Sequence, residues 1–184
     1  MAPVAVVPAA GRAERFGAPK LLVRIDGDVL LDLTLRALLD AGVDRVVVVA
    51  APGADLGVAS LVHDPRVSVL INPDPSRGMF SSIQIGLGAA TGDPILVLPA
   101  DMPFVATTTV TRVLGACVEH RCVTVPVWNG RRGHPVAFPA SLRPRILASN
   151  ATLKDALAAA GSVHEVVVDD PGVVRDVDVP ADLR

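Results

Sequence analysis

VAVVPAAGRAERFGAPKLL, residues 4–22, is the segment that most strongly indicates the fold class. Residues 4–7 are apolar without alternation, which is typical of a strand buried on both faces of a parallel sheet. Pro8 ends this run, and a loop of small residues follows it. In open α/β sheets, ligands bind at the carboxyl ends of strands, so this loop is the first candidate binding site.

The loop combines small residues with positive charge. Ala9, Ala10 and Gly11 allow backbone amides to approach a phosphate closely, and Arg15 and Lys20 add charges that attract a phosphate. The loop contains neither the dinucleotide fingerprint G-x-G-x-x-G nor the P-loop pattern G-x-x-x-x-G-K-[ST]. On these residues alone, a surface loop with solvated charges remains an alternative.

The rest of the chain alternates between predicted strands and predicted helices. Apolar runs that predict further buried strands cover residues 46–49, 67–71, 95–98 and 123–127. Helical spacing covers residues 30–41, 56–61, 79–90, 107–120 and 152–160, with Gly86 and Gly88 interrupting the third of these. The alternation predicts an α/β fold with right-handed crossovers and a mostly parallel sheet.

One segment departs from this alternation. Asn129-Gly130 lies between the runs 123–127 and 136–138 and predicts a hairpin, so the sheet gains a small antiparallel excursion. Two valine-rich runs follow, at residues 163–168 and 173–179.

The composition is that of one ordinary globular domain of 184 residues, with 51% hydrophobic and 20% charged residues. A net charge of −2 argues against a protein that binds nucleic acid by neutralising phosphates. Two cysteines make no disulfide framework, and no apolar run is long enough to span a membrane. These features predict a reduced, soluble and cytoplasmic protein with no nucleic-acid or membrane partner.

The loop pattern A-A-G-x-x-x-R-F-G-x-x-K-L-L, residues 9–22, resembles the signature loop of the MobA-like nucleotidyltransferases, and within them most closely that of molybdenum cofactor cytidylyltransferases. The resemblance implies a three-layer Rossmann-like fold of the nucleotide-diphospho-sugar transferase type. It also implies that Ala9, Ala10, Gly11, Arg15 and Lys20 bind the nucleotide, and that the last two are catalytic. Here the chain has Pro8 where leucine is usual and Ala13 where serine is usual.

A second block, Pro99-Ala100-Asp101-Met102-Pro103, follows the predicted strand 95–98. An aspartate at this edge of the sheet can share Mg²⁺ with a triphosphate, although it can also simply cap a turn. The block resembles the metal-binding turn of the family, which makes Asp101 a predicted catalytic, nucleotide-binding and metal-binding residue. The closing block, residues 176–183, implies Asp178 as a second ligand of Mg²⁺, with an acidic edge that binds nothing as the alternative.

The block Asn72-Pro73 with G-M-x-x-S-I-x-x-G-L, residues 78–87, resembles the segment that lies beside the nucleotide in the family. It implies that Asn72 and Ser82 bind the nucleotide, although a plain amphipathic helix with Ser82 as a filler explains the same residues.

The block G-R-R-G-H-P-V-A-F, residues 130–138, resembles the family segment that faces the acceptor. It implies acceptor-binding roles for Arg131, Arg132 and His134, with solvated hairpin charges and a structural histidine as alternatives. The family stretch G-D-x-G-A-R is replaced here by residues 149–155, where Lys154 is the candidate to supply the missing positive charge to the acceptor.

The resemblance implies an enzyme that transfers a nucleoside monophosphate from a nucleoside triphosphate to a phosphorylated acceptor and releases pyrophosphate. Ala9-Ala10-Gly11 favours CTP, and molybdenum cofactor is the implied acceptor, with a molybdoenzyme or chaperone as a protein partner. Two alternatives stay open. One is a sugar-phosphate or other small-molecule nucleotidyltransferase that uses GTP or another triphosphate, and the other is a nucleotide-binding protein without turnover.

Overall fold

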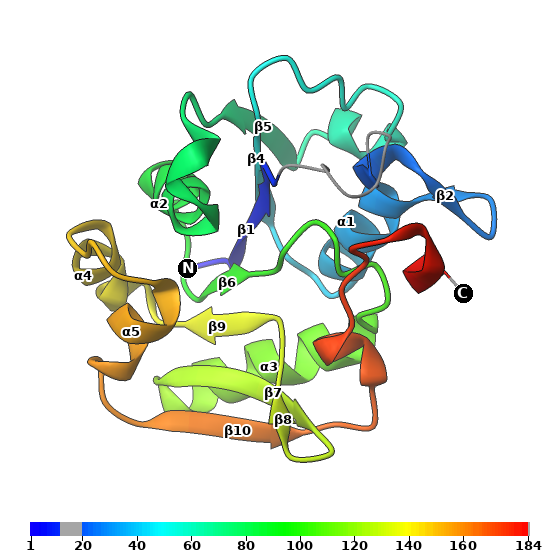
Figure 1. The fold of residues 1–184 in the computed structure, drawn as a ribbon. Coiled ribbons are helices and arrows are strands. Elements are labelled where there is room, and N and C mark those ends of the chain that lie inside the picture. The colour runs from blue at the N-terminus through cyan, green and yellow to red at the C-terminus, as the bar shows by residue number, and fades with distance from the viewer. Residues whose placement is uncertain (12–19, 184) are drawn as a thin grey trace.

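A computed structural model describes residues 1–11 and 20–183, and Figure 1 shows its ribbon. The central sheet has eight strands in the order β10-β7-β9-β6-β1-β4-β5, with β8 paired to β7. These strands are β1 (Val4–Ala9), β4 (Arg45–Ala50), β5 (Val67–Ile71), β6 (Ile95–Val97), β7 (Val123–Trp128), β8 (Arg131–Arg132), β9 (Val136–Phe138) and β10 (Val163–Val167). A separate two-stranded ribbon pairs β2 (Arg24–Ile25) with β3 (Asp28–Val29).

Helices and short 3-10 segments connect the strands. The α-helices are α1 (Leu30–Asp40), α2 (Met79–Ala89), α3 (Thr107–His120), α4 (Arg143–Leu147) and α5 (Leu153–Ala158). The 3-10 segments are η1 (Lys20–Leu22), η2 (Ser60–His63), η3 (Pro75–Arg77), η4 (Ala140–Leu142), η5 (Pro171–Val174) and η6 (Pro180–Leu183). Among the described residues, no helix has the length and hydropathy needed to cross a membrane.

The sheet is mostly parallel, with one antiparallel strand inserted in its middle. Strand β1 pairs in parallel with β4 and β6, and β10 pairs in parallel with β7. Strand β9 lies between β6 and β7 and is antiparallel to both, with Ala137 opposite Leu96 and Thr124. The α/β fold with a small antiparallel excursion is therefore confirmed.

Two hydrophobic clusters on opposite faces of the sheet make the fold three-layered. Because successive strand residues point to opposite faces, Ala5 and Val7 pack with α1 and α3, whereas Val4 and Val6 pack with α2, α4 and α5. Figure 1 shows α2, α4 and α5 on one side of the sheet and α1 on the other. One set of valine-rich strands thus contributes side chains to both hydrophobic clusters.

Helix α2 is continuous through Gly86, although an interruption was predicted there. A Cβ atom at Gly86 would lie only 2.4 Å from a methyl carbon of Val6, so the glycine is needed where α2 crosses β1 closely. The close crossing brings the start of α2, at Met79, to the carboxyl end of β1.

Two predictions about local structure are wrong, those for residues 67–71 and 56–61. Strand β5 is an edge strand rather than a strand covered on both faces, and Val69 and Ile71 are 41% and 49% exposed. Residues 56–61 do not form a helix. The carboxylate of Asp32, buried in α1, accepts hydrogen bonds from the Ser60 and Leu61 amides, so the 3-10 turn η2 begins only at Ser60. The valine-rich run 173–179 contains the end of η5 and no strand.

Candidate active site

A cavity of about 660 Å³ lies at the carboxyl ends of β1 and β4. It is lined by seven of the residues that the sequence predicts for nucleotide or metal binding, namely Ala9, Ala10, Gly11, Lys20, Ser82, Asp101 and Asp178. Arg15, the other residue predicted to be catalytic, lies outside the described residues. The position agrees with the general rule that open α/β sheets bind ligands at this edge.

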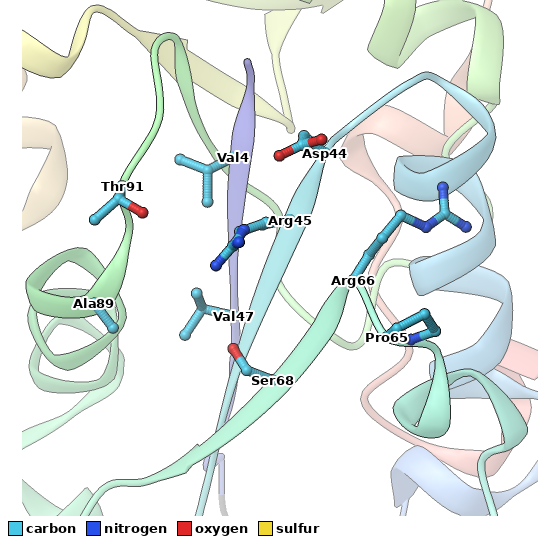
Figure 2. Close-up of a pocket in the computed structure, with 9 residues that line it drawn as sticks. All are labelled: Val4, Asp44, Arg45, Val47, Pro65, Arg66, Ser68, Ala89 and Thr91. Carbon is cyan, nitrogen blue, oxygen red and sulfur yellow. The ribbon is translucent and has the colours of Figure 1, made fainter. Parts of the chain in front are cut away.

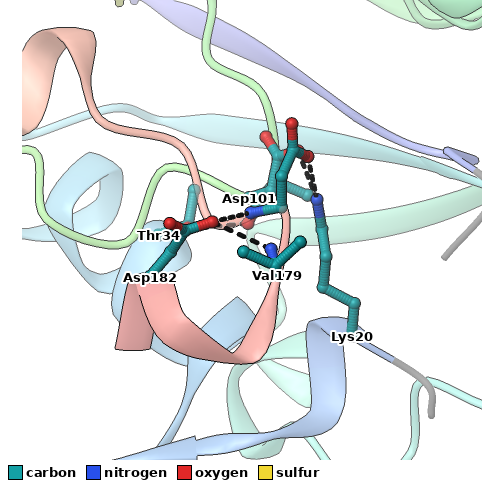
Figure 3. Close-up of polar contacts among 7 residues, drawn as sticks. Lys20, Thr34, Asp101, Val179 and Asp182 are labelled. Carbon is teal, nitrogen blue, oxygen red and sulfur yellow. Dashed lines mark hydrogen bonds and ion pairs between the residues drawn. The ribbon is translucent and has the colours of Figure 1, made fainter. Parts of the chain in front are cut away.

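Lys20 joins the two predicted metal ligands. Its ammonium nitrogen donates a hydrogen bond of 2.9 Å to Oδ2 of Asp101 and one of 3.0 Å to Oδ1 of Asp178. Figure 3 shows the Lys20 side chain extending toward Asp101. Burial alone would lower the pKa of Lys20, but the hydrogen bonds and charges of the two carboxylates outweigh it and raise the pKa. The lysine is therefore a permanent cation between two anions.

The turn that carries Asp101 is fixed by three backbone contacts. The Ala100 amide donates to the Pro8 carbonyl at 3.1 Å, and the Thr34 hydroxyl donates to the Ala100 carbonyl at 2.9 Å. The Val177 amide donates to the Asp101 carbonyl at 2.9 Å. The turn is thus held by β1, α1 and the C-terminal segment at once, which directs the Asp101 carboxylate into the cavity.

Asp178 is positioned by Asp182, a residue that the sequence analysis did not single out. One carboxylate oxygen of Asp182 accepts hydrogen bonds of 2.8 Å from the amides of both Asp178 and Val179, and Figure 3 shows it facing Val179. These two amides lower the pKa of Asp182, so the carboxylate holds the turn in its charged form.

Asn72 supports the cavity from behind and does not line it. Its buried side-chain amide donates to the hydroxyls of Ser81 and Ser82 at 2.8 and 2.9 Å, and its carbonyl accepts from the Asp74 amide. Of the two predicted residues in this block, Ser82 faces the cavity and Asn72 fixes the orientation of the Ser82 hydroxyl. Asn72, which was predicted to bind the nucleotide, therefore contacts this cavity only through Ser82.

A second cavity, of about 270 Å³, adjoins the first, and Met79 and Asp101 line both. Arg131, Arg132 and His134, the residues predicted to face the acceptor, lie in it. Arg132 is exposed and donates a hydrogen bond of 2.6 Å to Glu165 of β10. Asp176 lines the same cavity and was missed, because nothing in the sequence distinguishes it from its acidic neighbours.

His134 is held in the second cavity as a neutral ring. Its backbone amide donates to the Val173 carbonyl at 2.8 Å, and its ring nitrogen Nδ1 is enclosed without a hydrogen-bond partner among the described residues. Burial lowers the pKa of His134, and the Val97 backbone, Asp101 and Asp176 only partly oppose it.

Lys154 lines neither cavity. It lies in the short helix α5, whose N-terminus is closed by a capping box between Thr152 and Asp155. The preceding segment is tied to α2, because the Gln84 side-chain amide donates to the carbonyls of Ile146, Leu147 and Ser149. Of the segment that departs from the family pattern, Ser149 is thus bonded to α2, and residues 149–155 are not among those that line the second cavity.

Asp101 and Asp178 form a donor set that suits Mg²⁺. The described residues contain no group of three or more His, Cys, Asp or Glu side chains placed to hold a metal ion. Magnesium is commonly bound by one or two carboxylates and completed by substrate phosphates and water, so two carboxylates beside a large cavity fit it.

A further cavity, of about 330 Å³, opens at the opposite edge of the sheet, at the amino ends of β1, β4 and β5. Figure 2 shows Val4, Arg45 and Ser68 among the residues that line it. None of the predicted site residues lies there.

A family model described as the MobA-like NTP transferase domain matches residues 5–166. The chain belongs to this family. The match covers both cavities except for the C-terminal segment that carries Asp176 and Asp178. The resemblance noted in the sequence motifs is thereby confirmed.

The curated relatives of this MobA-like NTP transferase have differing names. Nicotine blue oxidoreductase of Paenarthrobacter nicotinovorans is 34% identical over 152 residues, covering 77% of this chain and 72% of the relative. Molybdenum cofactor cytidylyltransferase of Escherichia coli (strain K12) is 21% identical over 179 residues, covering 97% and 92%. A 2-C-methyl-D-erythritol 4-phosphate cytidylyltransferase of Saccharopolyspora erythraea is 36% identical over 135 residues, covering 69% and 60%.

Among solved structures, Rv0371c of Mycobacterium tuberculosis H37Rv has a TM-score of 0.84 and 25% identity, covering 99% of this chain and 96% of that one. A structure of Rv0371c in complex with manganese has a TM-score of 0.80 and 23% identity. The MobA-like fold is thus supported over nearly the whole length of the chain.

Proposed function

We propose that this chain transfers a nucleoside monophosphate, with CMP favoured, from a nucleoside triphosphate to a phosphorylated acceptor and releases pyrophosphate. Molybdenum cofactor is the favoured acceptor, and a molybdoenzyme or its chaperone would receive the product. The observation that carries the proposal is the junction of the two cavities at Asp101, with Lys20 on one side and Arg131 on the other.

The larger cavity is assigned to the nucleotide. Ala9, Ala10 and Gly11 line it, and small residues there let backbone amides contact phosphate oxygens. Lys20 lies within reach of the leaving pyrophosphate, and Arg15 is assigned to the same anion from the sequence. Ser82, oriented by Asn72, is placed to bind the ribose or the base.

The proposed reaction needs no general base. An oxygen of the acceptor phosphate attacks the α-phosphorus, and the bond from that phosphorus to the pyrophosphate oxygen breaks. A phosphate monoester is largely ionised near neutral pH, so no proton has to be removed from the nucleophile. Bound Mg²⁺, held by Asp101 and Asp178, would neutralise charge on the phosphates. The remaining task of the protein is to align the reactants and stabilise the leaving group.

The smaller cavity is assigned to the acceptor. Arg131 and Arg132 are exposed at its wall and suit an acceptor phosphate. A sugar phosphate or another phosphorylated alcohol is the second candidate. Two observations favour it: the relative named for 2-C-methyl-D-erythritol 4-phosphate, and the position of residues 149–155 away from this cavity.

The first test is a thermal-shift assay with CTP, GTP, ATP and UTP, each with and without Mg²⁺. A ligand at about 100 times its Kd adds about 2.7 kcal/mol to the stability of the folded state. We expect the largest shift with CTP and Mg²⁺. Release of pyrophosphate with molybdenum cofactor and with sugar phosphates then identifies the acceptor. NADH and NADPH are included because one relative is named as an oxidoreductase.

Asp101→Asn is the variant that tests the catalytic assignment. It removes a charge from the junction of the cavities but keeps the shape of the side chain, so the melting temperature without ligand should change little. We expect loss of pyrophosphate release. Full turnover in Asp101→Asn contradicts the proposed role. A shift with NADH or NADPH and with no nucleoside triphosphate contradicts the proposed reaction.

A further inference from the structure

The ammonium of Lys20 lies where a divalent cation shared by Asp101 and Asp178 would have to lie. Each carboxylate places one oxygen within 3.0 Å of the same nitrogen, from segments that are 81 and 158 residues away from the lysine along the chain. An ammonium is a compact point charge, unlike the planar guanidinium of arginine. Its position between two carboxylates therefore resembles that of a small metal ion.

The residue type strengthens this comparison. The chain has 17 lysines and arginines, and Lys20 and Lys154 are its only lysines. Arginine thus supplies nearly all the positive charge, but the cation between the two carboxylates is a lysine. A lysine has a flexible four-carbon stem, which allows its charge to move when a stronger anion binds nearby.

We propose that Lys20 is a resident cation that keeps divalent metal out of the Asp101–Asp178 pair until a nucleoside triphosphate draws its ammonium away. This inference rests on the proposed function, because it assigns an order to the assembly of the same site. The triphosphate carries more negative charge than the two carboxylates and enters the cavity that Lys20 lines. Once the ammonium turns to the phosphates, the two carboxylates are free to bind the metal.

The exposed fractions of the three side chains indicate from which side a metal ion would replace the ammonium of Lys20. The side chains of Lys20 and Asp101 are 14% and 23% exposed, whereas that of Asp178 is 57% exposed. A metal ion therefore reaches the pair from the side of Asp178. Metal and nucleotide then raise each other's affinity, because coupling between two binding sites is reciprocal.

The test is a titration of Mn²⁺ into the protein without nucleotide, followed by electron paramagnetic resonance of the free ion. We compare the wild type with Lys20→Gln and with the matched control Lys154→Gln, which removes the other lysine, a residue that lines neither cavity. Lys20→Gln should bind Mn²⁺ at least about tenfold more tightly than the wild type, within the usual range of site-to-site coupling. Lys154→Gln should behave as the wild type does.

Two further measurements locate the effect. The double variant Lys20→Gln/Asp178→Asn should lose the gain in Mn²⁺ affinity, because one carboxylate of the pair has become neutral. Lys20→Met serves as a second neutral variant, and circular dichroism checks that every variant is folded. In the wild type, Mn²⁺ should bind tightly only when CTP is also present.

The proposal is overturned if the wild type binds Mn²⁺ alone as tightly as Lys20→Gln does, or if Lys154→Gln gains as much. Failure of the proposed function gives a different result. A wild-type protein that binds none of the four triphosphates with Mn²⁺ contradicts the transfer reaction, whereas the titration of Lys20→Gln still decides whether Lys20 excludes the metal.

Discussion

The carboxylate of Asp170 accepts a hydrogen bond of 2.9 Å from the backbone amide of Ala106, the residue at the N-terminus of helix α3. The same oxygen accepts from the Thr109 hydroxyl at 2.7 Å, and the other oxygen accepts from the Gly172 amide at 2.9 Å. Ala106 has no side chain that could cap the helix, so a residue 64 positions away does this. The cap also ties α3 to the segment that lines the acceptor cavity.

Replacing Asp170 by alanine should destabilise the protein. The change leaves the buried Thr109 hydroxyl and the partly buried Ala106 amide without this partner, which costs about 1–3 kcal/mol. Urea denaturation measures the loss, and Asp170→Asn, which keeps one carbonyl oxygen, should lose less. Equal stability of the wild type and Asp170→Ala would show that α3 does not depend on this cap.

Gly133→Ala should distort the acceptor cavity. A Cβ atom at this position would lie 2.1 Å from the Val173 carbonyl oxygen, the same oxygen that accepts the His134 amide. Overpacking of this kind lowers the free energy of unfolding by about 1–3 kcal/mol. We expect the substitution to raise the KM for the acceptor more than the KM for the nucleotide. Thermal denaturation and kinetics with both substrates measure the two effects.

Gly115→Ala is the matched control for that substitution. Gly115 lies inside helix α3 with open space around its Cα, so alanine there should stabilise the protein by about 0.5–1 kcal/mol. If both glycine variants lose the same stability, close packing at Gly133 is not the cause.

The stability of the protein should fall on the acid side because of His134. Burial lowers the pKa of this ring from the usual 6.5, so the unfolded chain binds the proton more readily than the folded one. The contribution of His134 to the free energy of unfolding is therefore fully present above pH 6.5. It is lost as the pH falls from there toward the lowered pKa. Urea denaturation of His134→Gln at a series of pH values should show a shallower loss. The variant His63→Gln, at an exposed position, should keep the slope of the wild type.

The two cysteines should differ in reactivity. Cys117 is buried in α3, and burial raises the pKa of its thiol to about 11, whereas Cys122 is partly exposed. Because the thiolate is the reactive form, iodoacetamide should modify Cys122 first. Peptide mass spectrometry of briefly labelled protein measures the ratio, and preferential labelling of Cys117 would contradict the packing of α3.

Local sequence patterns predicted much of this fold because its strands are apolar runs and its helices have clear boundaries. Helix α3 covers the predicted residues 107–120, and the loop after β1, the turn at Asp101 and the block at His134 meet as expected. Residue types at strand ends are local information, and the parallel sheet brings these ends to one edge.

The errors concern contacts between distant segments. No residue near 56–61 in the sequence indicates that the Asp32 carboxylate accepts hydrogen bonds from the amides of Ser60 and Leu61. The sequence likewise does not indicate that the Asn72 side-chain amide donates to two serine hydroxyls of α2. The exposure of β5 follows from its place at the edge of the sheet, which depends on the whole topology and not on its own residues.

Strand β9 separates the part of the sheet that carries the nucleotide loop from the part formed by β7 and β10. The residues before it, from Arg131 to His134, shape the acceptor cavity without contributing to the pairing of β1 with β4 or β6. Substitutions of the exposed Arg131 and Arg132 in this hairpin can therefore change the cavity while the pairing of β1 stays intact. In evolutionary terms, the inserted strand lets the wall of one cavity vary independently of the other, and relatives of this chain are named for chemically different substrates.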